Sequence, residues 1–318
     1  MITSGIDRIF ISVKDMDESL AFYRDWVGMK IVADQPLDPF KIQQLWNLSK
    51  ETKARAVFLR KGEQPTMLEL IEFKPHSGKT IKADTQIWDY GIDDICFMVK
   101  DIENTYNGLM KKGFRFVSPP VFYSPGFVPF DVKETILIGP NEMRIAHVEV
   151  VSDLEPEAQG DLKIPVIKED YGLIVDSAQI VEDMDEVIRF YRDILGLTLV
   201  GDHKMPRGSL DEILPLPPGI DVRIALFNKE GSPPPVVEFL EFSRKGKSLA
   251  SIAKPPNLGI FMISFETDDL SGLMKRFNEE GIPVIAGPVE MEIAPHGKIK
   301  SIIVEGPSKV TIEFFQGV

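Results

Sequence analysis

The sequence repeats itself at two levels, and this repetition limits the folds that the chain can adopt. The segment DMDESLAFYRDWVGM, residues 15–29, returns as DMDEVIRFYRDILGL 168 positions later, and further matches keep that offset. Within the first copy, GIDRIFISVKD at residues 5–15 returns as GIDDICFMVKD at 91–101. We interpret the chain as a tandem duplication in which each copy contains two modules, giving four in all.

Each module is predicted to contain a strand, a helix and three further strands. Residues 6–13 alternate like a half-buried strand, and Asp15 can cap the segment that follows. That segment places apolar residues at helical spacing up to Gly28, where the helix should end. The second module repeats the order, with residues 102–112 as its helix and Gly113 as its end.

The length of 318 residues indicates about two domains. Residues 151–165, VSDLEPEAQGDLKIP, are acidic and follow neither the helical nor the strand period, so they are interpreted as a linker. We therefore expect a first domain at 1–150, a linker at 151–170 and a second domain at 171–318.

Composition narrows the possible partners. The net charge of −13 disfavours binding to nucleic acids and to anionic membranes, and no run of about 18 apolar residues is present. The single cysteine, Cys96, fits a reducing compartment and is expected to be a small core residue. We expect a soluble, cytoplasmic monomer or homodimer whose partner is a small molecule.

The repeated motif resembles that of a known superfamily. A strand, then V-x-D, then FYRDxxG occurs at Val13, Asp15 and residues 22–28, and again at Val181, Asp183 and residues 190–196. This pattern is similar to the vicinal oxygen chelate superfamily, which includes glyoxalases, bleomycin-resistance proteins and extradiol dioxygenases. The resemblance implies an α+β fold of four βαβββ modules in two tandem glyoxalase-like domains, each a curled eight-stranded mixed sheet around a cleft.

The resemblance also implies where site residues should lie. Metal-binding members of the superfamily use one inward position on the first strand and one on the last strand of each module. In this chain the first-strand positions are Arg8, Asp94, Asp176 and Met262. The last-strand positions are Glu69, Ala146, Glu238 and Glu313. With the domains divided as above, the first cleft would hold Arg8, Glu69, Asp94 and Ala146, and the second Asp176, Glu238, Met262 and Glu313.

The first cleft is expected to lack a metal because Arg8 carries a permanent positive charge there. Its guanidinium can bind Glu69 or Asp94 through forked hydrogen bonds. Arg8 would then form a buried structural ion pair, or would bind an anionic group of a substrate.

The second cleft is expected to gather three carboxylates, Asp176, Glu238 and Glu313, which would repel one another in a low dielectric. A bound divalent cation would relieve this repulsion, and oxygen ligands favour Mg²⁺, Mn²⁺ or Ca²⁺ over Zn²⁺ or Fe²⁺. Alternatively the carboxyl groups are protonated, or reach solvent or an arginine such as Arg223, and no metal binds.

Histidines give little support to iron chemistry. Extradiol dioxygenases hold Fe²⁺ with two histidines and one glutamate, whereas the matching positions here are Asp176, Met262 and Glu313, which disfavours this reaction. His296, in the hairpin-like IAPHGK, is either an acid–base residue or an exposed turn residue. His147 should point away from Ala146, on the opposite face of its strand.

Several apolar segments could line a pocket or could simply be core. Leu45, Trp46, Ile213 and Leu214 occupy matching insertions in the two copies and could close an apolar mouth. Tyr123, in residues 121–130, could line the first cleft in the same way.

Taken together, the sequence favours an enzyme that acts on a small oxygen-rich or aromatic metabolite by metal- or carboxylate-assisted proton abstraction, as lyases, isomerases and epimerases do. Glu238, Glu313 and His296 are its candidate catalytic residues. The alternative is a metal-free protein that binds or sequesters a small molecule. An enzyme would need Glu238 and Glu313 free to meet a ligand, whereas a binding protein could hold both in structural pairs.

Overall fold

The computed structural model describes residues 1–126, 130–151, 167, 169–208 and 210–318. The predicted α+β class and the four β-α-β-β-β modules are confirmed. Most of the predicted linker, namely 152–166 and 168, lies outside the described residues. Within the described residues, every helix is too short or too polar to span a lipid bilayer.

The elements follow the predicted order in every module. Module one contains β1 (Arg8–Val13), α1 (Met16–Tyr23), β2 (Lys30–Leu37), an inserted α2 (Pro39–Trp46), β3 (Lys53–Arg60) and β4 (Met67–Lys74). Module two contains β5 (Gly91–Ile92), β6 (Asp94–Val99), α3 (Ile102–Lys111), β7 (Arg115–Phe116), β8 (Val121–Tyr123), β9 (Val132–Ile138) and β10 (Arg144–Val150). Module three contains β11 (Tyr171–Val181), α4 (Met184–Ile188) with a π-helical turn (Arg189–Ile194), β12 (Thr198–Lys204), β13 (Val222–Asn228) and β14 (Val236–Phe242). Module four contains β15 (Gly259–Glu266), α5 (Leu270–Glu279), β16 (Val284–Ile293), β17 (Gly297–Glu305) and β18 (Thr311–Gly317).

The helix after the first strand begins in the same way in all four modules. An aspartate side chain caps each one by accepting a backbone N–H bond, as predicted for the first; the four are Asp15, Asp101, Asp183 and Asp269. After α1, Gly28 adopts a left-handed conformation, with a φ of 74°. These local signals fix where each module turns back from its helix to its sheet.

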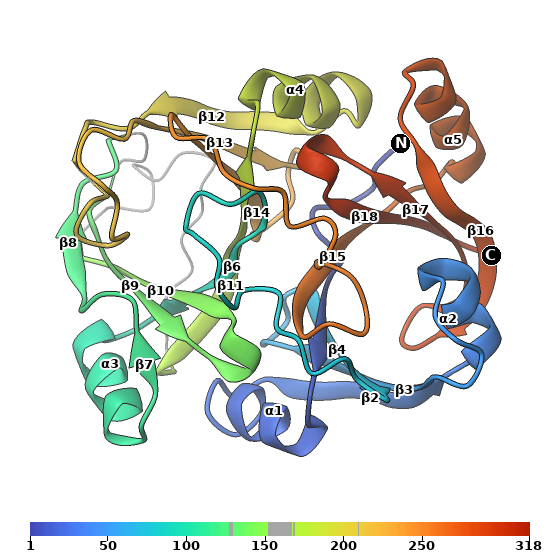
Figure 1. Cartoon of the computed structure of the whole chain (residues 1–318), viewed down its shortest axis with the longest axis horizontal. Helices are drawn as coiled ribbons and strands as arrows, with labels where there is room; N and C mark the ends of the chain where they lie inside the picture. The colour runs from blue at the N-terminus through green and yellow to red at the C-terminus, as the bar shows by residue number, and fades with distance from the viewer. Residues whose placement is uncertain (127–129, 152–166, 168, 209) are drawn as a thin grey trace.

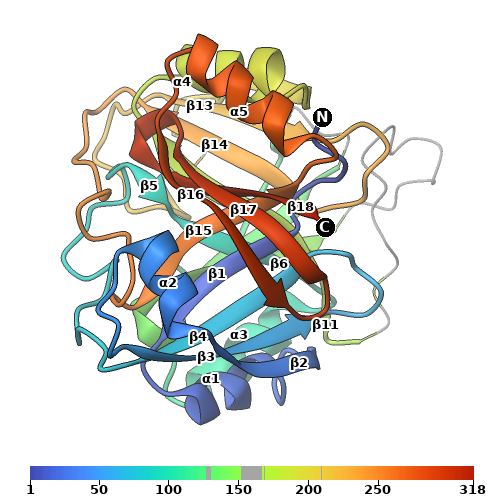
Figure 2. The ribbon, with the colours of Figure 1, turned by 90° about the vertical axis from the view of Figure 1, so that its right-hand side faces the viewer.

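The modules pair differently from the expectation. One sheet has the strand order β16-β17-β18-β15-β1-β4-β3-β2, so it joins module four to module one. The other has the order β12-β13-β14-β11-β6-β10-β9-β7, with β5 and β8 at its side, and joins module three to module two. We call modules one and four the outer half and modules two and three the inner half (Figures 1 and 2). The expectation that 1–150 and 171–318 each form a sheet of their own is therefore wrong.

The first strands of the modules and two connecting segments hold module one against module four, and module two against module three. Strand β1 pairs with β15, and β11 pairs with β6, both antiparallel. The segments 75–90 and 243–258 cross between the halves and bond to each other, for example from Ile81 N to Leu258 O at 2.8 Å and from Tyr90 N to Lys247 O at 2.8 Å. They lie near the centre of Figure 1. Each half therefore consists of segments far apart in the sequence.

Cutting the chain between residues 151 and 167 should not separate the two fragments. Each sheet takes strands from both sides of the cut, so separation would break the β1–β15 and β6–β11 ladders and expose their core. We expect an inserted protease site to yield fragments that still elute together in size-exclusion chromatography, and that separate only in denaturant. Two native peaks would contradict the strand pairing.

Helices α1, α3, α4 and α5 lie on the outside of the two sheets, which leaves the inner side of each curled sheet for packing or for a cavity (Figure 1). The inner side of the outer half is filled by a hydrophobic cluster that includes Phe10, Phe58, Phe73 and Phe315. Helix α2 packs against β16 and covers the same cluster with Leu45. The inner side of the outer half is thus filled by hydrophobic side chains around Arg8 on β1.

Candidate functional site

In the outer half, Arg8 occupies the centre of the sheet and is bound on both sides by carboxylates. Its Nη1 donates to Glu69 Oε2 at 2.9 Å, and its Nη2 donates to Glu313 Oε2 at 2.5 Å. Ser301 Oγ donates to the other oxygen of Glu313 at 2.6 Å. The Arg8 side chain is 1% exposed. Arg8 therefore takes the place that a metal cation would need among these carboxylates.

The surroundings of Arg8 complete its burial. The guanidinium carbon lies 4.9 Å from the ring centroids of Phe10 and Phe315, so the cation is sandwiched between two aromatic faces. Burial opposes the charge of Arg8, but Glu313 and Glu69 outweigh it and raise the pKa of Arg8. Burial also raises the pKa of Glu69 to about 8, against the opposing effect of Arg8.

His296 belongs to the outer half, at the turn between β16 and β17. Its Nε2 lies 3.2 Å from Asp7 Oδ2, and that carboxylate also accepts a bond from Arg8 Nε at 3.1 Å. The His296 side chain is 19% exposed and its ring packs on Phe315. It is therefore neither a freely exposed turn residue nor a neighbour of Glu238.

Three residues expected in clefts are core residues. Met262 on β15 is 1% exposed in the cluster around Phe10. Trp46, at the end of α2, packs edge-on against Phe73 and Phe261 at 5.7 Å, so it does not line an opening. Leu45 is buried in the same cluster.

Asp94 was expected beside Arg8, and this expectation is wrong. Asp94 starts β6, which belongs to the inner half, because β1 pairs with β15 rather than with β6. The carboxylate that joins Glu69 at Arg8 is instead Glu313, from module four.

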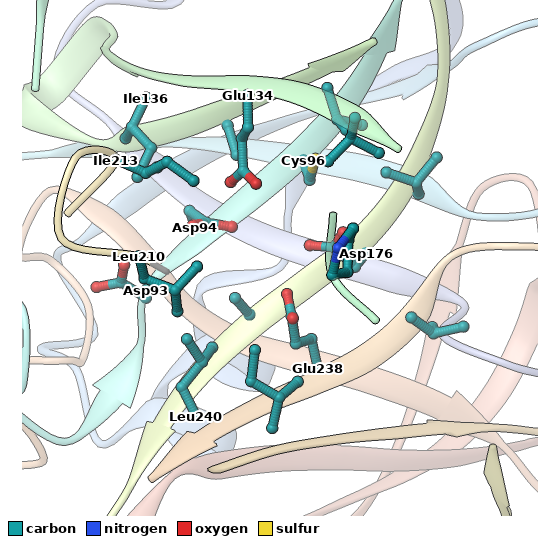
Figure 3. Close-up of a pocket in the computed structure, with 18 of the residues that line it drawn as sticks. Asp93, Asp94, Cys96, Glu134, Ile136, Asp176, Leu210, Ile213, Glu238 and Leu240 are labelled. Carbon is teal, nitrogen blue, oxygen red and sulfur yellow. The ribbon is translucent and has the colours of Figure 1, made fainter. Parts of the chain in front are cut away.

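The inner half contains a cavity of about 200 Å³ (Figure 3). Its walls are mainly aliphatic, and its polar groups come from strands β6, β9, β11 and β14 of one sheet and from the short strand β8. The polar side chains that face it are Asp94 and Cys96 on β6, Tyr123 on β8, Glu134 on β9, Asp176 on β11 and Glu238 on β14, with Asp93 beside them. Figure 3 shows the carboxyl groups of Asp94, Glu134, Asp176 and Glu238 around one common space.

Burial raises the pKa of all four carboxyl groups, and neighbouring carboxylates raise it further for Asp94, Asp176 and Glu238. Burial, followed by the charge of Glu134, raises the pKa of Glu238 to about 8. Burial and neighbouring carboxylates raise the pKa of Asp94 and of Asp176 well above the usual range. The pKa of Glu134 is also raised by burial, although its bond from Tyr123 opposes this. These raised pKa values favour the protonated forms, and a cation placed among the carboxyl groups would favour the ionised forms instead.

Of the four carboxyl groups, Glu134 has a hydrogen-bond donor, since Tyr123 Oη donates to its Oε2 at 2.6 Å. Burial has the larger effect on the pKa of Asp176 and raises it, whereas the Cys96 thiol lowers it. In the described part of the chain, Glu238 makes no hydrogen bond or ion pair, and Asp94 Oδ1 is buried without a partner. Asp94 is buried and Glu238 is half-buried, and unpartnered carboxyl groups that line a cavity are unusual in a structural core and typical of a binding site.

The positive charges near the cavity are already bound. Asp93 Oδ1 accepts bonds from Lys82 Nζ at 2.7 Å and from Arg144 Nη1. Burial raises the pKa of Asp93, but Arg144 and Lys82 outweigh it and lower the pKa below the usual value. Neither cation is therefore available to neutralise Asp176 or Glu238.

The metal site expected from Asp176, Glu238 and Glu313 does not form. Glu313 lies in the other half, bound to Arg8, because β18 belongs to the sheet of modules one and four. Among the described residues, no group of three or more His, Cys, Asp or Glu side chains is placed to hold a metal ion. Members of the superfamily commonly use divalent metals, but the donors in the described part of the chain are not placed to hold one.

Glu134 and Cys96 were not identified from the sequence as residues that line the cavity. Glu134 lies on the middle strand β9, whereas only first and last strands were searched for ligands. The repeat could have pointed to Glu134. Glu134 lies opposite Val148 as Ser301 lies opposite Phe315 in the outer half, so Glu134 is the counterpart of Ser301. Of the expected lining residues, Tyr123, Ala146, Ile213 and Leu214 do line a cavity, but it is that of the inner half. His147 faces away from it into the core, as expected.

Comparison with known proteins agrees with this architecture. The family model described as Glyoxalase/Bleomycin resistance protein/Dioxygenase superfamily matches residues 5–128 and 174–314. No curated protein matches the sequence. Among solved structures, glyoxalase I from Zea mays is 14% identical, with a TM-score of 0.63 over 99% of this chain and 93% of its own. A putative dioxygenase from Bacillus subtilis subsp. subtilis str. 168 is 13% identical, with a TM-score of 0.60 over 99% and 86%. The two matched segments cover most of the sequence, and the chain belongs to the glyoxalase, bleomycin resistance protein and dioxygenase superfamily.

Proposed function

We propose that the inner cavity is the active site of an enzyme that acts on a small molecule through proton transfer by Glu238. The observation that carries this proposal is the state of Glu238: it faces an apolar cavity, has no bonded partner among the described residues, and has a pKa of about 8. A carboxyl group with a pKa near the working pH is suited to both taking and returning a proton.

In this proposal the reaction begins with abstraction of a proton next to a carbonyl group. Ionised Glu238 takes the proton, and the electron pair of the broken C–H bond moves into the carbonyl to form an enolate. The raised pKa of Asp94 keeps that carboxyl protonated, so its hydrogen can be donated to the enolate oxygen. Return of the proton to another carbon or another face gives isomerase or epimerase chemistry, and loss of a leaving group gives lyase chemistry.

The other two candidate catalytic residues have different roles. Glu313 is held by Arg8 and Ser301, and His296 lies beside Asp7, so both serve the packing of the outer half. Of the two glutamates that were expected to separate an enzyme from a binding protein, only Glu238 is free.

A metal-free binding protein is the second candidate. It is favoured by the mainly aliphatic lining and by the bond from Tyr123 that holds Glu134 in place, which together suit retention of a ligand. Such a protein would bind its ligand in the same cavity and release it unchanged.

Hydrogen exchange in D₂O separates the two candidates. The protein is incubated with a panel of small carbonyl compounds, and loss of the C–H signal next to the carbonyl is followed by NMR. We expect exchange that speeds up as the pH rises towards 8, because only ionised Glu238 accepts a proton. Glu238→Gln should slow exchange by about 100-fold or more.

The matched control is Glu69→Gln, the equivalent residue of the outer half, which should leave exchange at the wild-type rate. Exchange that survives in Glu238→Gln, or that is lost in Glu69→Gln, contradicts the assignment. Tight binding without exchange identifies the protein as a binding protein.

A further inference from the structure

The two halves are related residue by residue, because their strand registers agree. Phe10 on β1 lies opposite Glu69 on β4, just as Ala178 on β11 lies opposite Glu238 on β14. At the offset of 168 residues, Arg8 corresponds to Asp176. The inner half therefore keeps the glutamate that binds Arg8 but has a carboxylate where the arginine would be.

The aromatic neighbours of Arg8 have also been replaced by small side chains. Phe315 lies opposite Ser301 on β17, as Val148 lies opposite Glu134 on β9. The rings of Phe10 and Phe315, which sandwich Arg8, thus correspond to Ala178 and Val148.

These replacements remove one guanidinium and two phenyl rings from the inner half. Asp176, Ala178 and Val148 all line the cavity. The cavity is therefore the space that the outer half fills with its own cation and its own aromatic groups.

The charge around this space is acidic and unbalanced. The titratable groups that face it are Asp94, Cys96, Tyr123, Glu134, Asp176 and Glu238, and the nearby cations Lys82 and Arg144 are bound to Asp93. Asp94 is 7% exposed, and its Oδ1 has no hydrogen-bond partner in the described part of the chain. An unpartnered buried oxygen that faces a cavity indicates that a ligand completes the site.

We propose that the ligand of the inner cavity is a small apolar or aromatic carbonyl compound that also carries a positively charged nitrogen, such as an amine, an amidine or a guanidine. The ligand supplies the cation that Arg8 supplies in the outer half, and its apolar body fills the space of the two missing rings. This inference rests on the proposed function, since it names the substrate class of the same cavity.

Binding of such a ligand displaces protons. Burial and the charge of Glu134 raise the pKa of Glu238 to about 8, whereas a cation beside the carboxyl groups favours their ionised forms. A cationic ligand therefore releases a proton near neutral pH, and a neutral ligand of the same shape releases none.

Isothermal titration calorimetry with phenylguanidine and its neutral analogue phenylurea tests this directly. At pH 7, in two buffers of different ionisation enthalpy, phenylguanidine should bind about tenfold or more tightly than phenylurea, since charge-assisted bonds to buried carboxylates are the stronger kind. Only phenylguanidine should release a proton. Equal affinities of the two compounds overturn the inference.

Two variants locate the binding. Asp176→Arg copies the outer half and should abolish phenylguanidine binding, because the new guanidinium occupies the cavity. Ala178→Phe removes the space without changing the charge, and should weaken the binding of both compounds. Glu69→Gln is the control and should bind as the wild type does. If Asp176→Arg does not fold, loss of binding in Ala178→Phe alone places the site, and unchanged binding there overturns the proposal.

The outcomes separate this inference from the proposed function. Glu238-dependent exchange on neutral compounds, with no preference for phenylguanidine, leaves the proposed function intact and overturns the cationic ligand class. Absence of both exchange and binding overturns both. Mg²⁺ or Mn²⁺ alone that releases the same proton and blocks phenylguanidine would show that the cavity takes a metal ion, which also overturns the inference.

Discussion

Replacing Arg8 with alanine is expected to lower the free energy of unfolding by about 3–5 kcal/mol. Arg8 is buried between Glu69 and Glu313, and its removal leaves two carboxyl groups facing each other with no cation between them. It also removes the group that fills the space between Phe10 and Phe315. Urea unfolding at pH 7, followed by circular dichroism, measures the change.

The control for this variant is Arg55→Ala. Arg55 makes a comparable pair of hydrogen bonds to Asp34, but both side chains are about 40% exposed. An exposed pair of this kind contributes about 1 kcal/mol or less. Equal effects of the two variants, or an unchanged midpoint for Arg8→Ala, would show that Arg8 does not hold the outer half together.

Glu238→Gln is expected to stabilise the protein at alkaline pH while having little effect at pH 5. The folded-state pKa of Glu238 is raised to about 8 from 4.5, so its protonated form is favoured by folding. That contribution is fully present below the unfolded pKa, declines as the pH rises from about 4.5 to 8, and is absent above that range. A shift of this size corresponds to about 3–5 kcal/mol. Glutamine resembles the protonated carboxyl group at every pH, so the variant avoids this loss.

Urea unfolding of both proteins at pH 5, 7 and 9 checks this expectation. The wild type should lose stability as the pH rises, and Glu238→Gln should lose clearly less. Some loss should remain in the variant, because Glu69, Asp94 and Asp176 also have raised pKa values. Parallel curves for the two proteins would mean that Glu238 titrates alike in the folded and unfolded states. In that case it would be an ordinary solvated carboxylate and a poor base near neutral pH.

The features that could be predicted from the sequence are local ones. The modules, their helices and the capping role of Asp15 follow from periodicity and from side-chain bonding within a few residues. The bond between Arg8 and Glu69 could be anticipated because β1 and β4 belong to one module and lie side by side. The carboxyl groups of Asp176 and Glu238 share a cavity for the same reason.

The pairing of modules could not be predicted, because the first strand of each module offers the same kind of free edge. Strand β1 could accept β6 or β15 with equal backbone geometry, and the entropy of closing the longer loop differs little. Side chains distant in sequence decide the matter: Glu313 binds Arg8, and Phe261 packs on Phe10. The error in pairing then placed Glu313 in the wrong cleft.

The most direct test of the account is a crystal structure of the protein with phenylguanidine bound. The account predicts its guanidinium beside Asp176 and Glu238 in the inner cavity and its ring against Ala178 and Val148, with Arg8 unmoved between Glu69 and Glu313. Phenylguanidine bound in the outer half, or an inner cavity that is filled by protein side chains, would contradict it.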